Sequence, residues 1–300
     1  MTFTNFQNGA TSFGIPLGGV PEVFAVPPEP NGRVRLVGAN QEYGTVASAV
    51  NAAGDGDTII LVGPTTFDES GIETPAGVDN VSIIGMGNVP RSTRWRSNNN
   101  AASPHITLRG SGWTIRNVYF AGGTADYCVE LLRDATYNSS ETRIIDCIFN
   151  GGSGHIQSNG GVANVQIRGC RFINARGGTA TIPGAIIATS TAQAVPTNWE
   201  IIGNRFYNCN DVINCGMSRS MVLHNWFQAT GHDGAATRVL CLADVGAGSA
   251  GDYNIVAHNF LGVAAAVVYN DDATLKFQDG ANSLWADNYA TDQVDYGAPA

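Results

Sequence analysis

The residues that could perform acid–base chemistry in this 300-residue chain are carboxylates on or beside expected strands. Elimination on a polysaccharide needs a group of acids that holds calcium and a basic residue that takes the proton, whereas glycoside hydrolysis needs two carboxyl groups roughly 5–9.5 Å apart. The strand-borne acids are Glu130, Asp146, Asp211, Asp244, Asp271 and Asp272. They do not recur at one position of neighbouring segments, so we predict no catalytic residue, no metal site and no cofactor.

Two arrangements of these acids leave alternatives open. Asp146 and Arg168 lie on neighbouring segments, where a salt bridge on a solvated face is predicted, although the same two groups could act as acid and base. Asp244 with the Asp271–Asp272 pair is the best candidate for a hydrolase, but aspartate is also common in turns. A hydrolytic site shared between two subunits would show only half of its residues in one chain.

Histidines and cysteines are the other groups that could bind a metal. His224 and His258 occupy the same position of two similar segments. No third ligand accompanies them, so the sequence predicts a stacked pair on the surface. The six cysteines lie far apart and form no CxxC pair, and we expect them to be buried free thiols. These are Cys128, Cys147, Cys170, Cys209, Cys215 and Cys241.

A six-residue motif recurs along the chain and indicates the elements that would position such groups. The copies are IRNVYF (115–120), IIDCIF (144–149), IRGCRF (167–172), IIGNRF (201–206), VLHNWF (222–227) and VAHNFL (256–261). Successive copies lie about 28 residues apart on average, a period typical of repeat architectures. Each copy is rich in Ile, Val and Phe and alternates at period 2, which predicts a β-strand.

A second series of short apolar segments lies between these copies. Its members are CVEL (128–131), HIQS (155–158), AIIA (185–188), DVIN (211–214), VLCL (239–242) and AVVY (266–269). The connecting stretches contain Gly, Ser and Asp turns rather than helices. An all-β parallel β-helix is therefore predicted, with at least two strands in each coil.

Equivalent positions on successive coils should stack into ladders. The position before the final aromatic pair of the motif is predicted to form a structural ladder of Cys147, Cys170, Asn204, Asn225, Asn259 and Asn288. Stacked asparagine amides can hydrogen-bond to one another, and asparagine tolerates the left-handed turn expected there. An aromatic ladder in the core is predicted for Phe120, Phe149, Phe172, Phe206 and Phe227.

The N-terminal part divides into an arm and a cap. Val46, Val50 and Ala53 have helical spacing, which predicts a capping helix at about 43–54, followed by coils at about 57–290. Residues 1–32 are rich in Pro and Gly and are predicted to be an extended arm that docks on a partner, with 33–300 as the β-helix domain. The residues expected to contact that partner are Phe3, Phe6, Phe13, Ile15, Pro16, Val20 and Phe24.

Charge and hydropathy exclude several classes of function. The net charge is -9, so direct binding to nucleic acid is not expected. No run reaches the ~18 apolar residues of a membrane span, and the first residues lack the pattern of a secretory signal, so folding in a cytoplasm is expected. The basic stretch RSTRWRSNNN is predicted to be a loop in which Arg94, Trp95 and Arg96 contact a glycan or a protein partner.

Two stretches resemble known proteins. NFQNGATSFGIPLGG resembles the opening of bacteriophage structural proteins, and GTVASAVNAAGDGDTIILVGPTTFDE is similar to the entry coil of right-handed parallel β-helix proteins of the pectate lyase-like superfamily. The resemblance implies a homotrimeric component of a virion, assembled in the host cytoplasm and held on capsid or tail proteins by its arm.

Three functions remain to be weighed. A head decoration protein is favoured, because the chain ends shortly after its last coil, whereas a tail spike is usually longer. The alternatives are a tail spike-like lyase or hydrolase that acts on surface polysaccharide, and an adhesin that binds a glycan.

Overall fold

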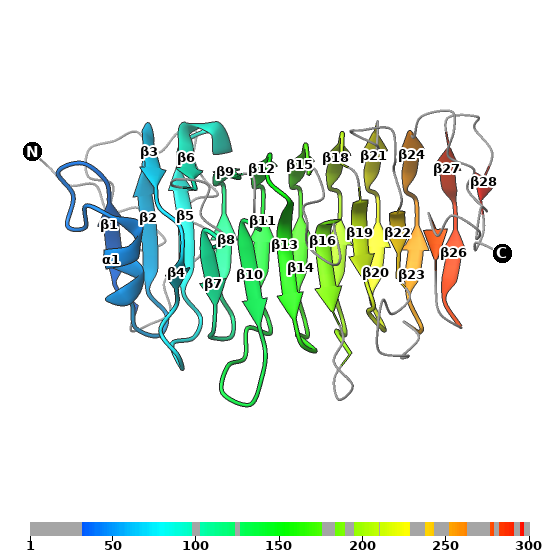
Figure 1. Cartoon of the computed structure of the whole chain (residues 1–300), viewed down its shortest axis with the longest axis horizontal. Coiled ribbons are helices and arrows are strands. Elements are labelled where there is room, and N and C mark those ends of the chain that lie inside the picture. The colour runs from blue at the N-terminus through cyan, green and yellow to red at the C-terminus, as the bar shows by residue number, and fades with distance from the viewer. Residues whose placement is uncertain are drawn as a thin grey trace, which may run out of the picture.

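The fold is a right-handed parallel β-helix, as the sequence predicts, and its coils stack along one long axis (Figure 1). The computed structural model describes residues 32–97, 103–123, 127–175, 184–189, 195–209, 211–228, 238–242, 252–262, 277–278, 282–290 and 295–296. Short runs rich in Val, Ile and Phe form the strands, because β-branched and aromatic side chains pack well on a pleated, half-buried surface.

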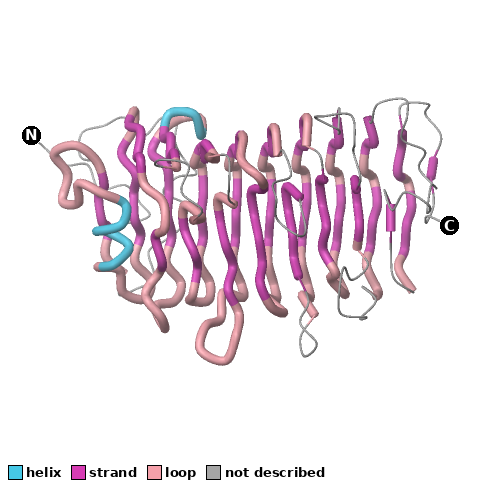
Figure 2. Tube along the Cα trace, viewed as in Figure 1, coloured by secondary structure: helices cyan, strands magenta, loops and turns pink. Residues whose placement is uncertain are grey.

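The described strands form three sheets, and strands far apart in the sequence lie side by side in each of them (Figure 2). Sheet 1 contains β1 (Val34–Val37), β2 (Thr58–Val62), β5 (Ser82–Met86), β8 (Thr114–Arg116), β11 (Arg143–Ile145), β14 (Gln166–Arg168), β17 (Glu200–Ile202), β20 (Met221–Leu223), β23 (Ile255–Ala257) and β26 (Leu284–Ala286). Sheet 2 contains β4 (Ile72–Glu73), β7 (Ile106–Leu108), β10 (Val129–Leu132), β13 (Gly154–Asn159), β16 (Gly184–Thr189), β19 (Asp211–Cys215), β22 (Arg238–Cys241) and β25 (Phe277–Gln278). Sheet 3 contains β3 (Thr65–Asp68), β6 (Thr93–Arg96), β9 (Tyr119–Ala121), β12 (Ile148–Asn150), β15 (Arg171–Ile173), β18 (Arg205–Tyr207), β21 (Trp226–Gln228), β24 (Phe260–Gly262), β27 (Asn288–Ala290) and β28 (Asp295–Tyr296).

The six-residue motif is split into two strands by one residue in the left-handed backbone region. In one coil β17 is followed by Gly203 at φ 67° and Asn204, after which β18 begins. The same position holds His224 at φ 56° and His258 at φ 55°. The sequence predicts this left-handed conformation at the ladder asparagines themselves, and that prediction is wrong by one residue. The residue before each asparagine makes the bend, and the asparagine side chain then points inward.

The predicted aromatic ladder is present in the core of the β-helix. The rings of Phe120, Phe149, Phe172, Phe206 and Phe227 are fully buried. Adjacent rings are nearly parallel, at 2–9°, with centroids 4.8–5.1 Å apart. Parallel pairing of the strands in register places these side chains on one line, so each ring packs on the ring of the next coil.

The predicted asparagine ladder is also present, and its polar atoms are satisfied. The side-chain oxygen of Asn225 accepts from the backbone N–H of Asn204 at 2.9 Å and from its amide at 3.1 Å. The amide of Asn225 donates to the backbone oxygen of Ile201 and to Oδ1 of Asn259. Asn288 continues the series below Asn259. Buried amides are tolerated here because each finds partners on the neighbouring coils.

Cysteines take the ladder position in earlier coils. Cys147 and Cys170 are buried free thiols, as are Cys128, Cys209 and Cys215, which confirms the prediction for these five. Burial raises the pKa of the Cys170 thiol, which also contacts Cys147, and burial raises the pKa of Cys209 to about 12. These side chains therefore fill space as small apolar groups rather than reacting as thiolates.

Helix α1 (Val46–Asn51) lies at the N-terminal end of the coils, where the sequence predicts a cap. The side chain of Thr45 accepts a hydrogen bond from the backbone N–H of Ser48 at 3.1 Å. The carboxylate of Glu69 accepts from the N–H groups of the first two helical residues at 2.7 and 2.9 Å. The helix is thereby fixed over the coil end, where it limits pairing of exposed strand edges with other chains.

Sheet 2 follows the second predicted series. The paired residues Val129, Ile156, Ile186, Ile213 and Leu240 form one register column. The predicted strand at 266–269 lies outside the described residues, and β22 pairs instead with β25. Within the described part of the chain, no helix is long and apolar enough to cross a bilayer.

The predicted arm lies outside the described residues, apart from Gly32. This applies to each residue expected to contact a partner, namely Phe3, Phe6, Phe13, Ile15, Pro16, Val20 and Phe24.

Candidate functional site

The outer face of sheet 3 carries a row of arginine and aromatic side chains. Successive side chains of a strand point to opposite faces, so the residues on either side of each core phenylalanine point outward. Pairing in register places these outward residues in two columns along the axis. The first column is Arg94, Tyr119, Ile148, Arg171, Arg205, Trp226, Phe260 and Tyr289, and the second is Arg96, Ala121, Asn150, Ile173, Tyr207 and Gln228.

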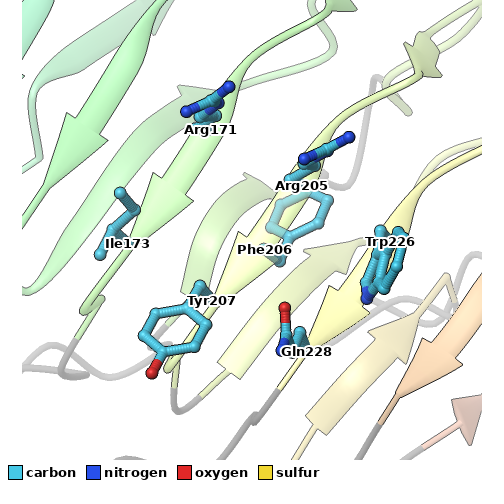
Figure 3. A pocket seen from close by; sticks show the side chains of 7 residues that line it. All are labelled: Arg171, Ile173, Arg205, Phe206, Tyr207, Trp226 and Gln228. Atoms are coloured by element: carbon cyan, nitrogen blue, oxygen red, sulfur yellow. The ribbon is translucent and has the colours of Figure 1, made fainter.

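A shallow cavity of about 180 Å³ lies on this face, and we call it the recess. Its lining residues are Arg171, Ile173, Arg205, Phe206, Tyr207, Trp226 and Gln228. Figure 3 shows their arrangement on three neighbouring strands, with Arg171, Arg205 and Trp226 in one row and Ile173, Tyr207 and Gln228 in a second. The lining contains guanidinium, phenol, indole and amide groups and no carboxylate, thiol or imidazole.

The aromatic side chains of this face are held by neighbours on adjacent coils. The guanidinium of Arg205 lies 5.8 Å from the ring centroid of Trp226, and the ring of Phe260 on the following coil packs edge to face against Trp226 with centroids 4.9 Å apart. Arg94 lies 5.7 Å from the ring of Tyr119 in the same way. Such contacts restrict the orientations of half-exposed rings.

The arginines of the recess differ from other arginines on this sheet. Arg96 forms a two-point salt bridge with Asp68, at 2.5 and 2.6 Å, and this hydrogen-bonded pair lowers the pKa of the Asp68 carboxyl. Among the described residues, neither Arg171 nor Arg205 has a carboxylate within salt-bridge distance. Within the part of the chain that the structure describes, the two positive charges of the recess therefore have no carboxylate partner.

The sequence-predicted contact residues Arg94, Trp95 and Arg96 do not form an exposed loop. They belong to strand β6, which follows the short helix η1 (Pro90–Ser92). Trp95 is fully buried, stacks on Phe120 at 5.4 Å and donates its indole N–H to the backbone oxygen of Glu69. The expectation that Trp95 touches a ligand is wrong, because its side chain points inward and begins the aromatic ladder. Arg94 and Arg96 point outward and are exposed.

The acids considered for catalysis are dispersed. Glu130 accepts hydrogen bonds from Thr107 at 2.9 Å and from Asn159 at 2.6 Å on the outer face of sheet 2. Asp244, Asp271 and Asp272 lie outside the described residues, as does the side chain of Asp211.

The predicted salt bridge between Asp146 and Arg168 is wrong. Asp146 lies at the bend and faces Arg116 at 3.4 Å, whereas Arg168 pairs with Glu200 on the next coil. Asp146 and Arg168 belong to different columns. The register partner of Arg168 is Ile145, the last residue of β11, and Asp146 follows it at the left-handed bend.

The histidines do not form a metal site within the described part of the chain. His224 and His258 stack at 5.0 Å with an interplanar angle of 8°, which confirms the predicted surface pair. Burial lowers the pKa of His105 to about 4 and of His155 to about 3. His155 packs against Phe149 at 5.7 Å. Both buried rings are neutral packing groups beside the aromatic ladder.

The position of the recess could have been predicted from the sequence. RFI at 171–173, RFY at 205–207 and WFQ at 226–228 are the ends of aligned motifs, and period-2 alternation places their first and third residues on the outer face. The repeated inner residues are easier to recognise than these variable outer ones.

No protein-family model matches the sequence, and no curated protein sequence matches it. Among solved structures, an alginate lyase from Paenibacillus sp. str. FPU-7 has a TM-score of 0.55 at 13% identity and covers 82% of this chain and 80% of its own. A pectin methylesterase from Aspergillus niger has a TM-score of 0.46 at 11% identity, covering 85% of this chain and 91% of its own. ORF18 of Geobacillus virus E2 has a TM-score of 0.44 at 11% identity, covering 80% and 55%. The structural neighbours are pectate lyase-like parallel β-helix proteins, and the likeness shows the fold alone.

Proposed function

We propose that this chain is a non-enzymatic structural protein of a bacteriophage particle, and more specifically a decoration protein that projects from the head. In this proposal the β-helix is a rigid prism, residues 1–32 attach it to capsid or tail proteins, and the protein resides in virions assembled in the host cytoplasm. The observation that carries the non-enzymatic part is that the lining of the recess contains no carboxylate, so it offers neither the acids that would hold calcium for elimination nor the two carboxyl groups of a glycoside hydrolase.

Two carboxylates on the outer face of sheet 2 are bound by neighbouring side chains. Glu73 forms a salt bridge with Arg109 at 2.5 Å, and Glu130 is held by Thr107 and Asn159. Thr107 of β7 is the register partner of both Glu73 of β4 and Glu130 of β10. The two glutamates therefore lie on either side of β7, two strands apart.

The attachment of the protein to a particle is supported by the resemblance of residues 5–19 to the opening of bacteriophage structural proteins. A homotrimer is supported by apolar side chains on the outer face of sheet 1. Ile255 is 39% exposed and Leu284 is 58% exposed, and they are paired neighbours in one column. Exposed apolar residues that continue from strand to strand suit contacts between copies of a chain.

Two measurements on the full-length protein test the proposal. The first is incorporation into particles of the full chain and of a variant that lacks residues 2–32, with circular dichroism to verify that both are folded. We expect the full chain to join particles and the shortened chain to remain folded and unbound. Incorporation of the shortened chain would overturn the role of the arm, and failure of the full chain to join any particle would overturn the structural role.

The second measurement is depolymerisation of bacterial surface polysaccharides, followed by the formation of unsaturated products and of new reducing ends. We expect neither product. Cleavage that is lost in the Glu130→Gln variant, and retained in an Arg143→Gln control on the outer face of sheet 1, would instead identify a lyase or hydrolase.

A further inference from the structure

We propose that residues 20–30 of this chain dock along the outer face of sheet 3 of the same chain. In this contact the segment lies extended on the first column of outward residues, and Glu22 and Glu29 are bound by arginines of that column. The contact joins two parts of one molecule, so it does not depend on the structural role proposed above.

The first column of sheet 3 presents arginines without acidic neighbours. Arg94, Arg171 and Arg205 are exposed and belong to this one column, on strands β6, β15 and β18. Within the described residues none of the three has a carboxylate within salt-bridge distance, whereas Arg96 binds Asp68. Because the whole chain carries a net charge of -9, a face whose arginines have no carboxylate partner favours an acidic occupant.

The predicted arm has the complementary composition. Residues 1–32 contain two acids, Glu22 and Glu29, and no Lys or Arg. The stretch PEVFAVPPEP at 21–30 contains four prolines, which favour the extended polyproline II conformation. A segment that already prefers an extended conformation loses little conformational entropy when it docks on a surface.

The arm is long enough to reach the recess from the point where it joins β1. In sheet 1, β14 and β17 are the fifth and sixth strands after β1, and they precede β15 and β18 in their coils. Arg171 and Arg205 therefore lie about 24 and 29 Å along the axis from β1, at ~4.8 Å for each strand. Glu22 precedes Arg33 by 11 residues, which span about 34 Å in polyproline II. Glu22 can therefore lie at the level of these two arginines.

The spacing of the two acids along the arm agrees with the spacing of the arginines. Glu22 and Glu29 are seven residues apart, which is about 22 Å in polyproline II. Arg94 lies three strands from Arg171 and four from Arg205, or about 14 and 19 Å along the axis. The long side chains of Glu and Arg make up the remaining difference. When Glu22 lies beside the arginines of the recess, Glu29 therefore lies beside Arg94, nearer to β1.

The recess accepts the compact side chains next to Glu22. It is shallow, at about 180 Å³, and its second row includes Ile173 and Tyr207, of which Tyr207 is 50% exposed (Figure 3). Pro21 and Val23 flank Glu22 and bring small apolar surfaces to this row. Surfaces lined by aromatic side chains commonly bind proline-rich segments in this way.

The segment binds through its side chains rather than as an added strand. β15, β18 and β21 are each paired with a strand on both sides, so sheet 3 has no free edge at the recess. The arm instead crosses these strands along the axis of the β-helix. This contact leaves the ring of Trp226 packed against Phe260.

Docking also regulates the availability of the arm, and this consequence rests on the proposed function. An arm that lies on its own β-helix is not open to capsid or tail proteins, so attachment to a particle must displace it. Before assembly, the contact keeps Val23, Phe24 and Val26 from other copies of the chain. After attachment, the arginines of the recess face solvent.

Proteolysis of the full chain measures this contact without a particle. Chymotrypsin cleaves after Phe24 when the segment is undocked, and Phe6 lies outside the segment and is the internal control. Mass spectrometry of the released peptides gives both rates. We expect cleavage after Phe24 to be about tenfold slower in the full chain than in a synthetic peptide of residues 15–31, because docking shields this bond.

Charge variants of the full chain make the test specific. Arg171→Gln combined with Arg205→Gln should accelerate cleavage after Phe24 about fivefold, with unchanged cleavage at the internal control and an unchanged melting temperature. Glu22→Arg should have the same effect. Glu22→Arg combined with Arg171→Glu and Arg205→Glu should restore slow cleavage. Arg143→Gln on sheet 1 is the control and should be cleaved like the parent.

The proposal is overturned if Phe24 is cleaved as fast in the full chain as in the peptide, or if the double arginine variant is cleaved like the parent. Failure of the charge reversal to restore slow cleavage also contradicts it. Protection that increases with protein concentration would show docking on another copy and would overturn the contact within one chain. None of these measurements uses particles, so their outcome is separate from that of the incorporation test of the proposed function.

Discussion

The two faces of sheet 3 are made by the same strands, yet they follow opposite rules. On the inner face, Phe149, Phe172 and Phe206 repeat one residue type at nearly constant spacing and are fully buried. On the outer face, the residues that precede them in the strand are Ile148, Arg171 and Arg205, and the residue type changes along the column.

This difference follows from the different physical requirements of the two faces. The interior must fill a channel of constant cross-section, so identical rings and amides on successive coils satisfy one another. The outer face must only keep the protein soluble, which polar and ion-paired side chains do. Exposed aromatic side chains and arginines without an ion-pair partner therefore need a further explanation. The recess is such a departure, and its residues should contribute to binding rather than to stability.

The largest effect that this comparison predicts is on the inner face. Phe172→Ala should lower the free energy of unfolding by about 3–5 kcal/mol, because it removes a buried ring that Phe149, Phe206 and His155 contact and leaves a cavity. Urea denaturation measures this loss. A loss below about 1 kcal/mol would show that the aromatic ladder does not stabilise the coils.

The asparagine ladder comes next. Asn225→Leu should cost about 2–4 kcal/mol, because the backbone N–H of Asn204 and the backbone oxygen of Ile201 lose their partners while remaining buried. Thermal melting measures the change, and Asn51→Leu at the exposed end of helix α1 is the control. Equal melting temperatures for the two variants would contradict the ladder.

Acid should destabilise the inner side of the fold through its buried histidines. Burial holds the pKa of His155 at about 3, below the ~6.5 of the unfolded chain, so its stabilising contribution is complete above pH 6.5 and is lost as the pH falls toward 3. Between pH 7 and pH 5 this residue should account for about 2 kcal/mol. His155→Phe should lose less stability than the parent over that range in urea denaturation, and an unchanged pH dependence would rule out this explanation.

The smallest effect on stability is expected on the outer face. Arg205→Gln should change the free energy of unfolding by no more than about 0.5 kcal/mol, because the side chain is exposed and makes no salt bridge with a described residue. A calorimetric comparison with Phe172→Ala sharpens the contrast between the faces. If Arg205→Gln destabilises as much as the core variant does, the outer row is a structural element and not a binding surface.

Sequence patterns were sufficient for the inner columns because those columns repeat. The ladder from Asn204 to Asn288 and the stack of His224 on His258 follow directly from aligned motifs, and the cap at α1 follows from helical spacing next to Gly54.

Predictions from the sequence pattern were wrong where the repeat is imperfect or where a bend changes the direction of the chain. Trp95 stands where later coils have phenylalanine, but its flanking arginines resemble a basic loop, so its inward direction is visible only once β6 is paired with β9. Asp146 and Arg168 are close in aligned sequence, yet the left-handed bend at Asp146 turns its side chain toward Arg116. The recess was not predicted for a third reason. Its outward residues differ from coil to coil, so they leave no periodic signal in the sequence.

Cryo-electron microscopy of phage particles purified from the source of this chain is the most direct test of a rigid structural protein held on a particle. We predict a β-helix standing on the particle, with residues 1–32 against shell proteins and with Arg171, Arg205 and Trp226 facing solvent. Particles that lack the chain, or a β-helix whose sheet 3 is buried against the particle, would contradict this function.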